Sequence, residues 1–260
     1  MQLSAIVIAK NEADNIERCL TSLRFTDEQV VIDSGSTDDT AAIAQKLGAR
    51  IIQHPWRGYG PQKNIGLAAA HGTWALFVDA DEEVTPQLAS DINRTLKRPE
   101  QDFYWLRILT IFLGKPLMHL YGHNPRLFKK SAGKWTNNIV HEQVETLDGI
   151  RIRLKDNHSA ILQQPLLHYS HATIAAYLKR MHHYTTLDAQ QMVKTGRHRL
   201  GRAAQPTATL PYQLAAKQLF KMLLYRHGFI DGYPGVVWSV LSAYYEWEMA
   251  QKYVKSTHQK

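Results

Sequence analysis

Residues 74–84 read WALFVDADEEV, five apolar residues followed by four carboxylates in the next five positions. A short apolar run of this kind, after the turn signal HGT at 71–73, is typical of an internal parallel strand that is buried on both faces. The strand would end at Asp79, and ligands of open α/β sheets bind outside the carboxyl ends of the strands. We therefore expect Asp79 and Asp81 to lie at a binding site.

Crowded carboxylates repel one another unless a positive group joins them. A hard divalent cation, held by one or two carboxylates and completed by substrate phosphates, is the usual partner. This stretch therefore predicts a site for Mg²⁺ or Mn²⁺ that also holds a phosphorylated ligand.

The segments before this strand alternate between strand and helix patterns. Apolar strand patterns occupy 3–9, 29–33 and 49–54, and helical patterns begin near residues 12, 37 and 62. Alternation at this spacing predicts right-handed βαβ crossovers and a mostly parallel sheet flanked by helices. Asn11 is expected to cap the first helix, and Ser36 or Thr37 the second.

The pattern changes after the acidic stretch. A helix is expected over 86–97 and a strand over 102–112, followed by loops and short strands up to about 171. Helices are then expected over 173–194, 212–227 and 234–254. We therefore divide the 260 residues into an α/β domain, 1–171, and a C-terminal helical region, 172–260.

Charge is distributed unevenly between these two regions. Residues 1–171 hold 19 Lys/Arg and 19 Asp/Glu, whereas residues 172–260 hold 12 and 4, so the whole net charge of +8 lies in the second region. A basic segment can bind nucleic acid or an anionic membrane, or it can simply be a solvated surface.

Cys19 is the only cysteine, which excludes an internal disulfide and a cysteine-rich zinc site and fits a reducing compartment.

A second acid follows a neighbouring strand. The stretch VVIDSGSTDDT at 30–40 puts Asp33 at the same carboxyl edge as Asp79, where it could accept a hydrogen bond from a ring or ribose group. The alternative is that this segment is only a turn and a helix cap. No Walker or Gly-x-Gly-x-x-Gly motif follows any predicted strand, which favours a nucleotide held by acids and a metal ion.

The motifs and their order resemble a known family. They are AIVIAKNEADNIERCLTSL (5–23), VVIDSGSTDDT (30–40), GYGPQKNIGLAAAHGTWALFVDADEEV (58–84), RLFKKSAGKW (126–135) and VHEQV (140–144). Together they resemble inverting family 2 glycosyltransferases of the GT-A (Rossmann-like) fold, and more closely the bacterial lipopolysaccharide-core glucosyltransferases. The segment 228–253 resembles the C-terminal part of the same subfamily.

The resemblance implies roles for the acids. Asp33 would contact the uracil ring of a UDP-sugar, Asp79 the ribose or the metal, and Asp81 the metal. In VHEQV it makes Glu142 the general base that takes the proton of the acceptor hydroxyl, and His141 a group that orients the acceptor or the diphosphate. A bound Mg²⁺ or Mn²⁺ would stabilise the negative charge that develops on the leaving diphosphate.

Four further side chains are candidate site residues, and three of them have a purely structural alternative. Lys63, in GYGPQKN, is expected to contact the substrate. Arg126 could neutralise phosphate or be surface charge, and Trp135 could be a sugar platform or a core aromatic. His168 could be a metal ligand beside the acids or a structural histidine.

The helix over 234–254 carries a broad apolar and aromatic face, including Val236, Val240, Tyr244 and Trp247. Such a face either packs on a core or, with the basic excess, lies on an anionic membrane.

The first strand begins within two residues of the N-terminus, so we expect no targeting segment before it. We expect a cytoplasmic protein at the inner face of the membrane.

These observations favour an inverting enzyme that transfers a hexose, glucose in our interpretation, from a UDP-sugar to a lipopolysaccharide-core or other lipid-linked saccharide. No nucleic-acid partner is expected. One alternative is a nucleotidyltransferase acting on sugar phosphates, which should carry a Gly-rich basic loop after the first strand, where this chain has AKNEADN. Another is a basic nucleic-acid-binding module, which leaves the aligned acids unexplained.

Overall fold

The computed structural model describes residues 2–138, 142–154, 156–171, 173–198 and 201–258. The chain forms two compact units. Unit 1 comprises Met1–Leu109 and Gly122–His168, and unit 2 comprises Thr110–Tyr121 and Tyr169–Lys260. The sequence-based division assigned all residues up to 171 to one domain, whereas 110–121 cluster with the helices of unit 2.

The first half of unit 1 is the expected parallel sheet. Strands β1 (Leu3–Ala9), β2 (Glu28–Asp33), β3 (Arg50–Gln53) and β4 (Trp74–Asp79) lie in the order β3-β2-β1-β4. They are connected by α1 (Ala13–Ser22), α2 (Thr40–Lys46) and α3 (Tyr59–Ala69). β1 is therefore flanked by β2 and β4, and the chain changes direction across the sheet at this strand.

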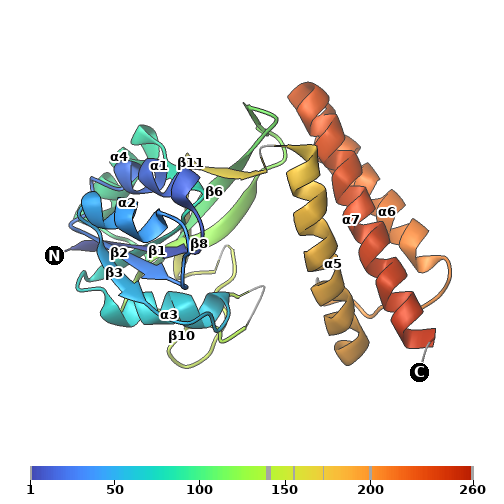
Figure 1. Cartoon of the computed structure of the whole chain (residues 1–260), viewed down its shortest axis with the longest axis horizontal. Helices are drawn as coiled ribbons and strands as arrows, with labels where there is room; N and C mark the ends of the chain where they lie inside the picture. Colours follow the sequence, from blue (N-terminus) through green and yellow to red (C-terminus); the bar gives the residue numbers. More distant parts are fainter. Residues whose placement is uncertain (1, 139–141, 155, 172, 199–200, 259–260) are drawn as a thin grey trace. The chain divides into compact units, whose positions relative to one another are not determined.

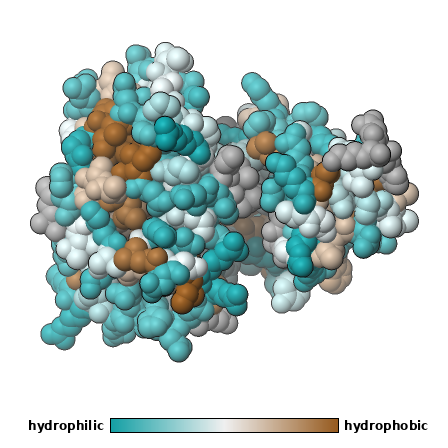
Figure 2. Space-filling view, turned by 90° about the horizontal axis from the view of Figure 1, so that it is seen from below, coloured by the Kyte–Doolittle hydropathy of each residue, from teal (hydrophilic) through white to brown (hydrophobic). Residues whose placement is uncertain are grey.

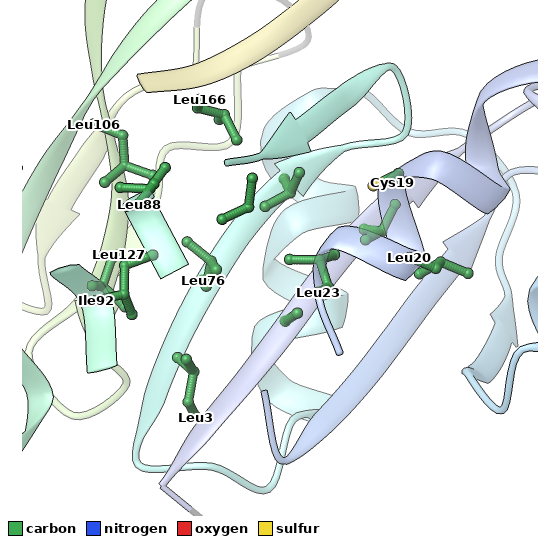
Figure 3. Packing of buried hydrophobic residues seen from close by; sticks show 14 of the residues in the cluster. Leu3, Cys19, Leu20, Leu23, Leu76, Leu88, Ile92, Leu106, Leu127 and Leu166 are labelled. Atoms are coloured by element: carbon green, nitrogen blue, oxygen red, sulfur yellow. The ribbon is translucent and has the colours of Figure 1, made fainter. Parts of the chain in front are cut away.

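Helices cover both faces of this sheet, with α1, α2 and α4 (Pro86–Lys97) on one face and α3 on the other (Figure 1). Because successive side chains of a strand point to opposite faces, Ala5 and Val7 of β1 join the first layer and Ile6 joins the second. Figure 3 shows the first layer, to which Leu20 of α1, Leu76 of β4 and Leu88 of α4 all belong. This burial on both faces explains the continuous apolar runs of β1 and β4.

The second half of the sheet is antiparallel. β8 (Gly122–Lys129) pairs antiparallel with both β4 and β6 (Phe103–Phe112), and the sheet continues through β11 (Ser159–His171) to the short β5 (Glu82–Val84). β9 (Gly133–Trp135) and β10 (Val144–Thr146) form a separate two-stranded sheet, and β7 (Lys115–Pro116) pairs with β6. The expectation of only loops and short strands after residue 112 is wrong, since β8 has 8 residues and β11 has 13.

The expected helix caps are also wrong. α1 begins at Ala13 and α2 at Thr40, and neither has a side-chain cap hydrogen bond from its N-cap residue. Asn11 instead has a positive φ of 56°, and its Oδ1 accepts the Thr37 N–H at 2.8 Å. The loops after β1 and β2 lie side by side, so Asn11 satisfies a backbone group of the other loop.

Unit 2 is helical. It contains α5 (Ile174–Thr195), α6 (Leu210–Phe220), a π turn η1 (Lys221–Tyr225), a 3₁₀ turn η2 (Gly228–Asp231) and the long α7 (Gly232–His258). Thr173 caps α5 by accepting the Ala176 N–H at 3.1 Å. The predicted helices are thus present, except that the second changes to a π turn at Lys221.

The apolar face expected on α7 divides into two. Val237 and Leu241 pack in the core of unit 2, whereas Val236, Val240 and Tyr244 are exposed. Among the helices that the structure describes, none has the length and apolar character to cross a bilayer. α7 is therefore a core helix with an exposed apolar stripe.

Candidate active site

Two acids lie at one edge of the parallel sheet. Asp33 is the Cα partner of Ala9 across β1 and β2, and Asp79 is the partner of Ile8 across β1 and β4. The last residues of β1 therefore have an acid on either side, as the strand order predicts.

Asp79 is held by an arginine and by a buried glutamate. Arg126 Nη2 donates to Asp79 Oδ2 and to Glu82 Oε1, each at 2.7 Å, and the Asp79 N–H donates to Glu82 Oε2 at 2.8 Å. Glu82 is only 1% exposed. These contacts fix both the backbone and the carboxylate of Asp79.

The two carboxyl groups have opposite pKa shifts. Burial alone would raise the pKa of Asp79, but the charges of Arg126 and Lys63 outweigh burial and hold it well below its usual range. Burial and the charge of Asp79 raise the pKa of Glu82 to about 7, although Arg126 opposes them. Asp79 is therefore the ionised partner, and Glu82 titrates near neutrality.

Arg126 has hydrogen-bonding capacity to spare. Arg126 is 5% exposed, and among the described atoms its Nε and Nη1 have no hydrogen-bond partner. Buried donors are rarely left in this state without a ligand or an ordered water. An anion bound beside Asp79 could accept from these two nitrogens.

Lys63 joins Asp79 to Glu142. Its ammonium forms a close ion pair with Glu142 Oε1 and lies 3.9 Å from Asp79 Oδ1. The same nitrogen lies 4.4 Å from the centre of the Trp135 ring, a cation–π contact. A residue of α3 thus connects the edge of the sheet with the segment that precedes β10.

The docking of α3 against β9 sets the position of Lys63. The Asn64 side chain bonds the Trp135 backbone twice, donating to its carbonyl at 2.8 Å and accepting its N–H at 2.9 Å. Gly60 allows this approach, because a Cβ there would lie 1.8 Å from the Thr136 carbonyl oxygen.

Asp81, in the turn before β5, faces His168 on β11. His168 Nε2 lies 3.4 Å from Asp81 Oδ2, and His168 is the strand partner of Glu82. Burial lowers the pKa of His168, but its contact with Asp81 and the charges of Glu82 and Asp79 outweigh burial and raise it. An imidazole nitrogen and a carboxylate oxygen from different elements therefore converge.

This pair fits part of a metal site. Adjacent ligands of a six-coordinate ion with bonds of about 2.1 Å lie about 3 Å apart, close to the separation of Asp81 and His168. The described residues contain no group of three or more His, Cys, Asp or Glu side chains that could hold an ion by themselves. Asp81 and His168, with Asp79 nearby, could supply some of the ligands if substrate phosphates supplied the rest.

Asp33 is occupied by its own turn. It is 1% exposed, and its carboxylate accepts the Ser36 hydroxyl and the Ser36 N–H, the latter at 3.2 Å from Oδ2. Asp33 therefore lies at the sheet edge and organises its own turn, and its role as a nucleotide contact stays a prediction. Next to it, Ser34 Oγ accepts from Gln62 Nε2 at 2.8 Å, which ties β2 to α3.

Trp135 is a core aromatic. It is 3% exposed and packs edge-on against Phe77, with ring centres 5.2 Å apart, and against Phe128. A sugar ring has no open face of this indole to stack on, so the platform interpretation is wrong for this structure. His141 lies outside the described residues.

Glu82 is the site residue that sequence reasoning missed. The run DADEEV places it three positions after β4 ends, where an acid would be taken for one more exposed charge. Only its pairing with β11 and the approach of Arg126 show that it is buried. The one signal in the sequence was the two-residue spacing of Glu82 and Val84, which puts both on one side of a strand, and in β5 both face inward.

Comparison with known proteins agrees with this geometry. The family model described as Glycosyl transferase family 2 matches residues 4–157. An uncharacterized glycosyltransferase of Rickettsia conorii is 31% identical over 261 residues, which cover 94% of this chain and 86% of the relative. Lipopolysaccharide core biosynthesis glycosyltransferase LpsC of Rhizobium meliloti is 28% identical over 261 residues, covering 94% and 91%.

One solved structure is similar in fold, and at its low sequence identity the match supports the fold alone. S. aureus TarS matches with a TM-score of 0.51 and 15% identity over 96% of this chain and 55% of that chain. The resemblance inferred from the motifs is thereby confirmed at the level of family and fold, including a relative in lipopolysaccharide core biosynthesis. The chain belongs to glycosyl transferase family 2 and is a glycosyltransferase with a GT-A-type fold.

Proposed function

We propose that this glycosyltransferase moves a hexose, glucose in our assignment, from a UDP-sugar to a lipopolysaccharide-core or other lipid-linked saccharide, with inversion at the anomeric carbon. One observation carries the proposal: Lys63 contacts Glu142 and approaches Asp79, so a candidate base and a candidate donor-binding acid lie in one cluster. Direct displacement requires these two groups to act on opposite sides of one sugar.

The donor end of the site would be the edge formed by β1, β2 and β4. Asp33 and Asp79 would contact the nucleoside, and Asp81 with His168 would hold Mg²⁺ or Mn²⁺. When bound, the ion would act as a Lewis acid on the diphosphate oxygens. The unpartnered nitrogens of Arg126 support a role in binding the same diphosphate.

Glu142 would act as the general base. The acceptor oxygen forms a bond to the anomeric carbon while the bond from that carbon to the diphosphate breaks, and the acceptor proton passes to Glu142. Lys63 engages Oε1, which leaves Oε2 to take the proton. General-base catalysis of this kind contributes roughly 10²- to 10⁴-fold to the rate.

The acceptor proposal rests on the relative named for lipopolysaccharide core biosynthesis and on the basic character of the C-terminal region. A lipid-linked acceptor would bring the enzyme to the cytoplasmic face of the membrane, where anionic lipids attract basic surfaces. Peripheral attachment, without a spanning segment, would be sufficient for this encounter.

The decisive experiment is transfer from a panel of UDP-, GDP- and dTDP-sugars in Mn²⁺ or Mg²⁺, with NMR of the product's anomeric proton. We expect turnover of a UDP-hexose and an inverted linkage. A preference for GDP- or dTDP-sugars would reject the uracil assignment of Asp33, and a retained configuration would reject Glu142 as the base. Pyrophosphate release from a nucleoside triphosphate and a sugar phosphate would favour the nucleotidyltransferase alternative.

A further inference from the structure

The acidic side chains of unit 2 are all engaged inside the unit. Each of the four is buried or nearly so and bonds a neighbouring side chain: Asp188 with Tyr245 at 2.7 Å, Asp231 with His119 at 2.8 Å, Glu246 with His198 at 2.8 Å and Glu248 with Lys252 at 2.7 Å. These acids therefore contribute little negative charge to the outer surface of unit 2.

The basic side chains are distributed in the opposite way. Many of them are exposed, including Lys115, Lys179, Lys194, Lys217 and Lys221. With the acids buried and the bases exposed, the surface of unit 2 is more positive than its net charge alone indicates. A surface of this kind attracts an anionic partner and repels a second copy of itself.

One end of unit 2 exposes a cluster of large apolar side chains within ten residues, which we call the apolar tip. Its members are Leu224 (50% exposed), Tyr225 (76%), Phe229 (50%), Ile230 (55%) and Tyr233 (69%). They occupy η1, η2 and the start of α7, at the end of that helix opposite the C-terminus (Figure 1). The end that carries the C-terminus faces the reader in Figure 2 and is mostly hydrophilic.

The backbone of the apolar tip is fixed. The Asp231 carboxylate accepts hydrogen bonds from His119 Nδ1 at 2.8 Å and from the backbone N–H of His119 at 3.0 Å. These bonds tie η2 to the segment 110–121. Gly228 packs so closely that a Cβ would lie 2.6 Å from the Met222 carbonyl oxygen. The apolar side chains are thus presented to solvent by an ordered turn.

We propose that the apolar tip docks into the boundary between the headgroups and acyl chains of an anionic lipid bilayer. Amphipathic surfaces with aromatic residues and flanking bases bind there, and lysines near anionic lipid strengthen the binding. Single-stranded nucleic acid would match the charge and could stack on the aromatic side chains, but it offers no apolar phase for Leu224 and Ile230. Docking to a bilayer extends the proposed function. The identity of the lipid-linked acceptor rests on that proposal, whereas binding to the bilayer does not.

The first test is co-sedimentation of the full chain with vesicles of phosphatidylcholine alone or with about one-third phosphatidylglycerol. We expect binding to the anionic vesicles, weakened by salt. The double variant Phe229→Ser/Ile230→Ser should lose at least tenfold in vesicle affinity. The matched control is Leu147→Ser/Ile150→Ser, which removes two apolar side chains that are 55% and 66% exposed in unit 1. Equal loss in both variants, or in neither, overturns the proposal.

The second test does not depend on a destabilising change. Cys19 is fully buried, so Ile230→Cys and, as control, Ile150→Cys each introduce one accessible thiol for an environment-sensitive fluorophore. The label at 230 should shift to the blue with anionic vesicles, whereas the label at 150 should not. No shift at 230 overturns docking through this turn.

Further measurements distinguish a bilayer from the two other possible partners, a second copy of the chain and nucleic acid. A dimer in light scattering that the serine double variant abolishes, or tighter binding to single-stranded DNA than to vesicles, would overturn the proposal. Turnover, measured beside vesicle binding, separates the failure of the proposed function from the failure of docking. Vesicle binding without turnover of any nucleotide-sugar would reject the proposed function alone, and turnover without vesicle binding would reject docking alone.

Discussion

Lys63 and Glu142 form an ion pair although they are 79 positions apart in the chain, and the same ammonium group lies 3.9 Å from Asp79 Oδ1. Three segments meet at this nitrogen: α3, the end of β4 and the segment before β10. The contact makes Lys63 the link between the sheet edge and the candidate base, so changes on either side should have separable effects.

Asp81→Ala should abolish divalent-metal-dependent binding of UDP-sugar and leave the fold intact, because Asp81 lies in the turn between β4 and β5 and faces His168. Calorimetric titration with UDP in the presence of Mn²⁺ or of EDTA measures the effect. Asp148→Ala, at an exposed turn of unit 1, is the matched control. Normal Mn²⁺-dependent binding by Asp81→Ala would remove Asp81 from the metal site.

Glu142→Gln should retain donor binding and lose roughly 10²- to 10⁴-fold in kcat, because an amide of the same shape cannot accept the proton. Glu145→Gln, on β10, is the control for an altered charge in the same segment. The assay is initial rate at saturating donor, with UDP affinity measured in parallel. Unchanged turnover would assign the base to another residue.

Gly60→Ala should destabilise the protein by about 1 to 3 kcal/mol, because the added Cβ would lie 1.8 Å from the Thr136 carbonyl oxygen and force α3 away from β9. Transfer activity should fall as well, since Lys63 is on the same helix. Gly122→Ala is the control, because a Cβ there meets nothing within 4 Å. Urea denaturation gives the free energies, and equal stability of the two variants would contradict the close approach.

Stability should fall in acid through Glu28. Burial alone would raise its pKa, but hydrogen bonds from His71, Ser4 and Arg50 outweigh burial and lower the pKa from its usual value near 4.5 to about 2. A carboxyl whose pKa is lower when folded stabilises the fold above the unfolded pKa and loses that stabilisation as the pH falls. This stabilisation is lost between about pH 4.5 and pH 2.

Glu28→Gln should therefore be less stable at pH 7 and less sensitive to pH over this acid range. Denaturation at a series of pH values measures both effects, with Glu100→Gln, at an exposed position, as control. The same pH slope in Glu28→Gln and in the parent chain would show that other carboxyl groups govern acid unfolding.

Much of unit 1 follows from the order of residues alone. The apolar runs of β1, β2 and β4 and the helices between them are local patterns, and parallel strands joined by right-handed crossovers have few possible orders. Asp33 and Asp79 each end such a strand, so their placement at one edge could be inferred before any contact was known. The long helices of unit 2 are equally local, and their residue ranges were close to those predicted.

The remaining features depend on which segments meet in space. Asn11 bonds the Thr37 N–H because two loops lie side by side, and Trp135 is buried because α3 and β4 close over it. The burial of Glu82 depends on a strand that begins about 75 residues later, and its charge state on Arg126 from β8. A side chain's exposure and pKa are set by neighbours that are distant in the sequence, and local patterns carry no record of them. For this reason the chain's order of residues yields the family and the sheet edge, whereas the Lys63–Glu142 pair and the buried acids of unit 2 emerge only when the chain is folded.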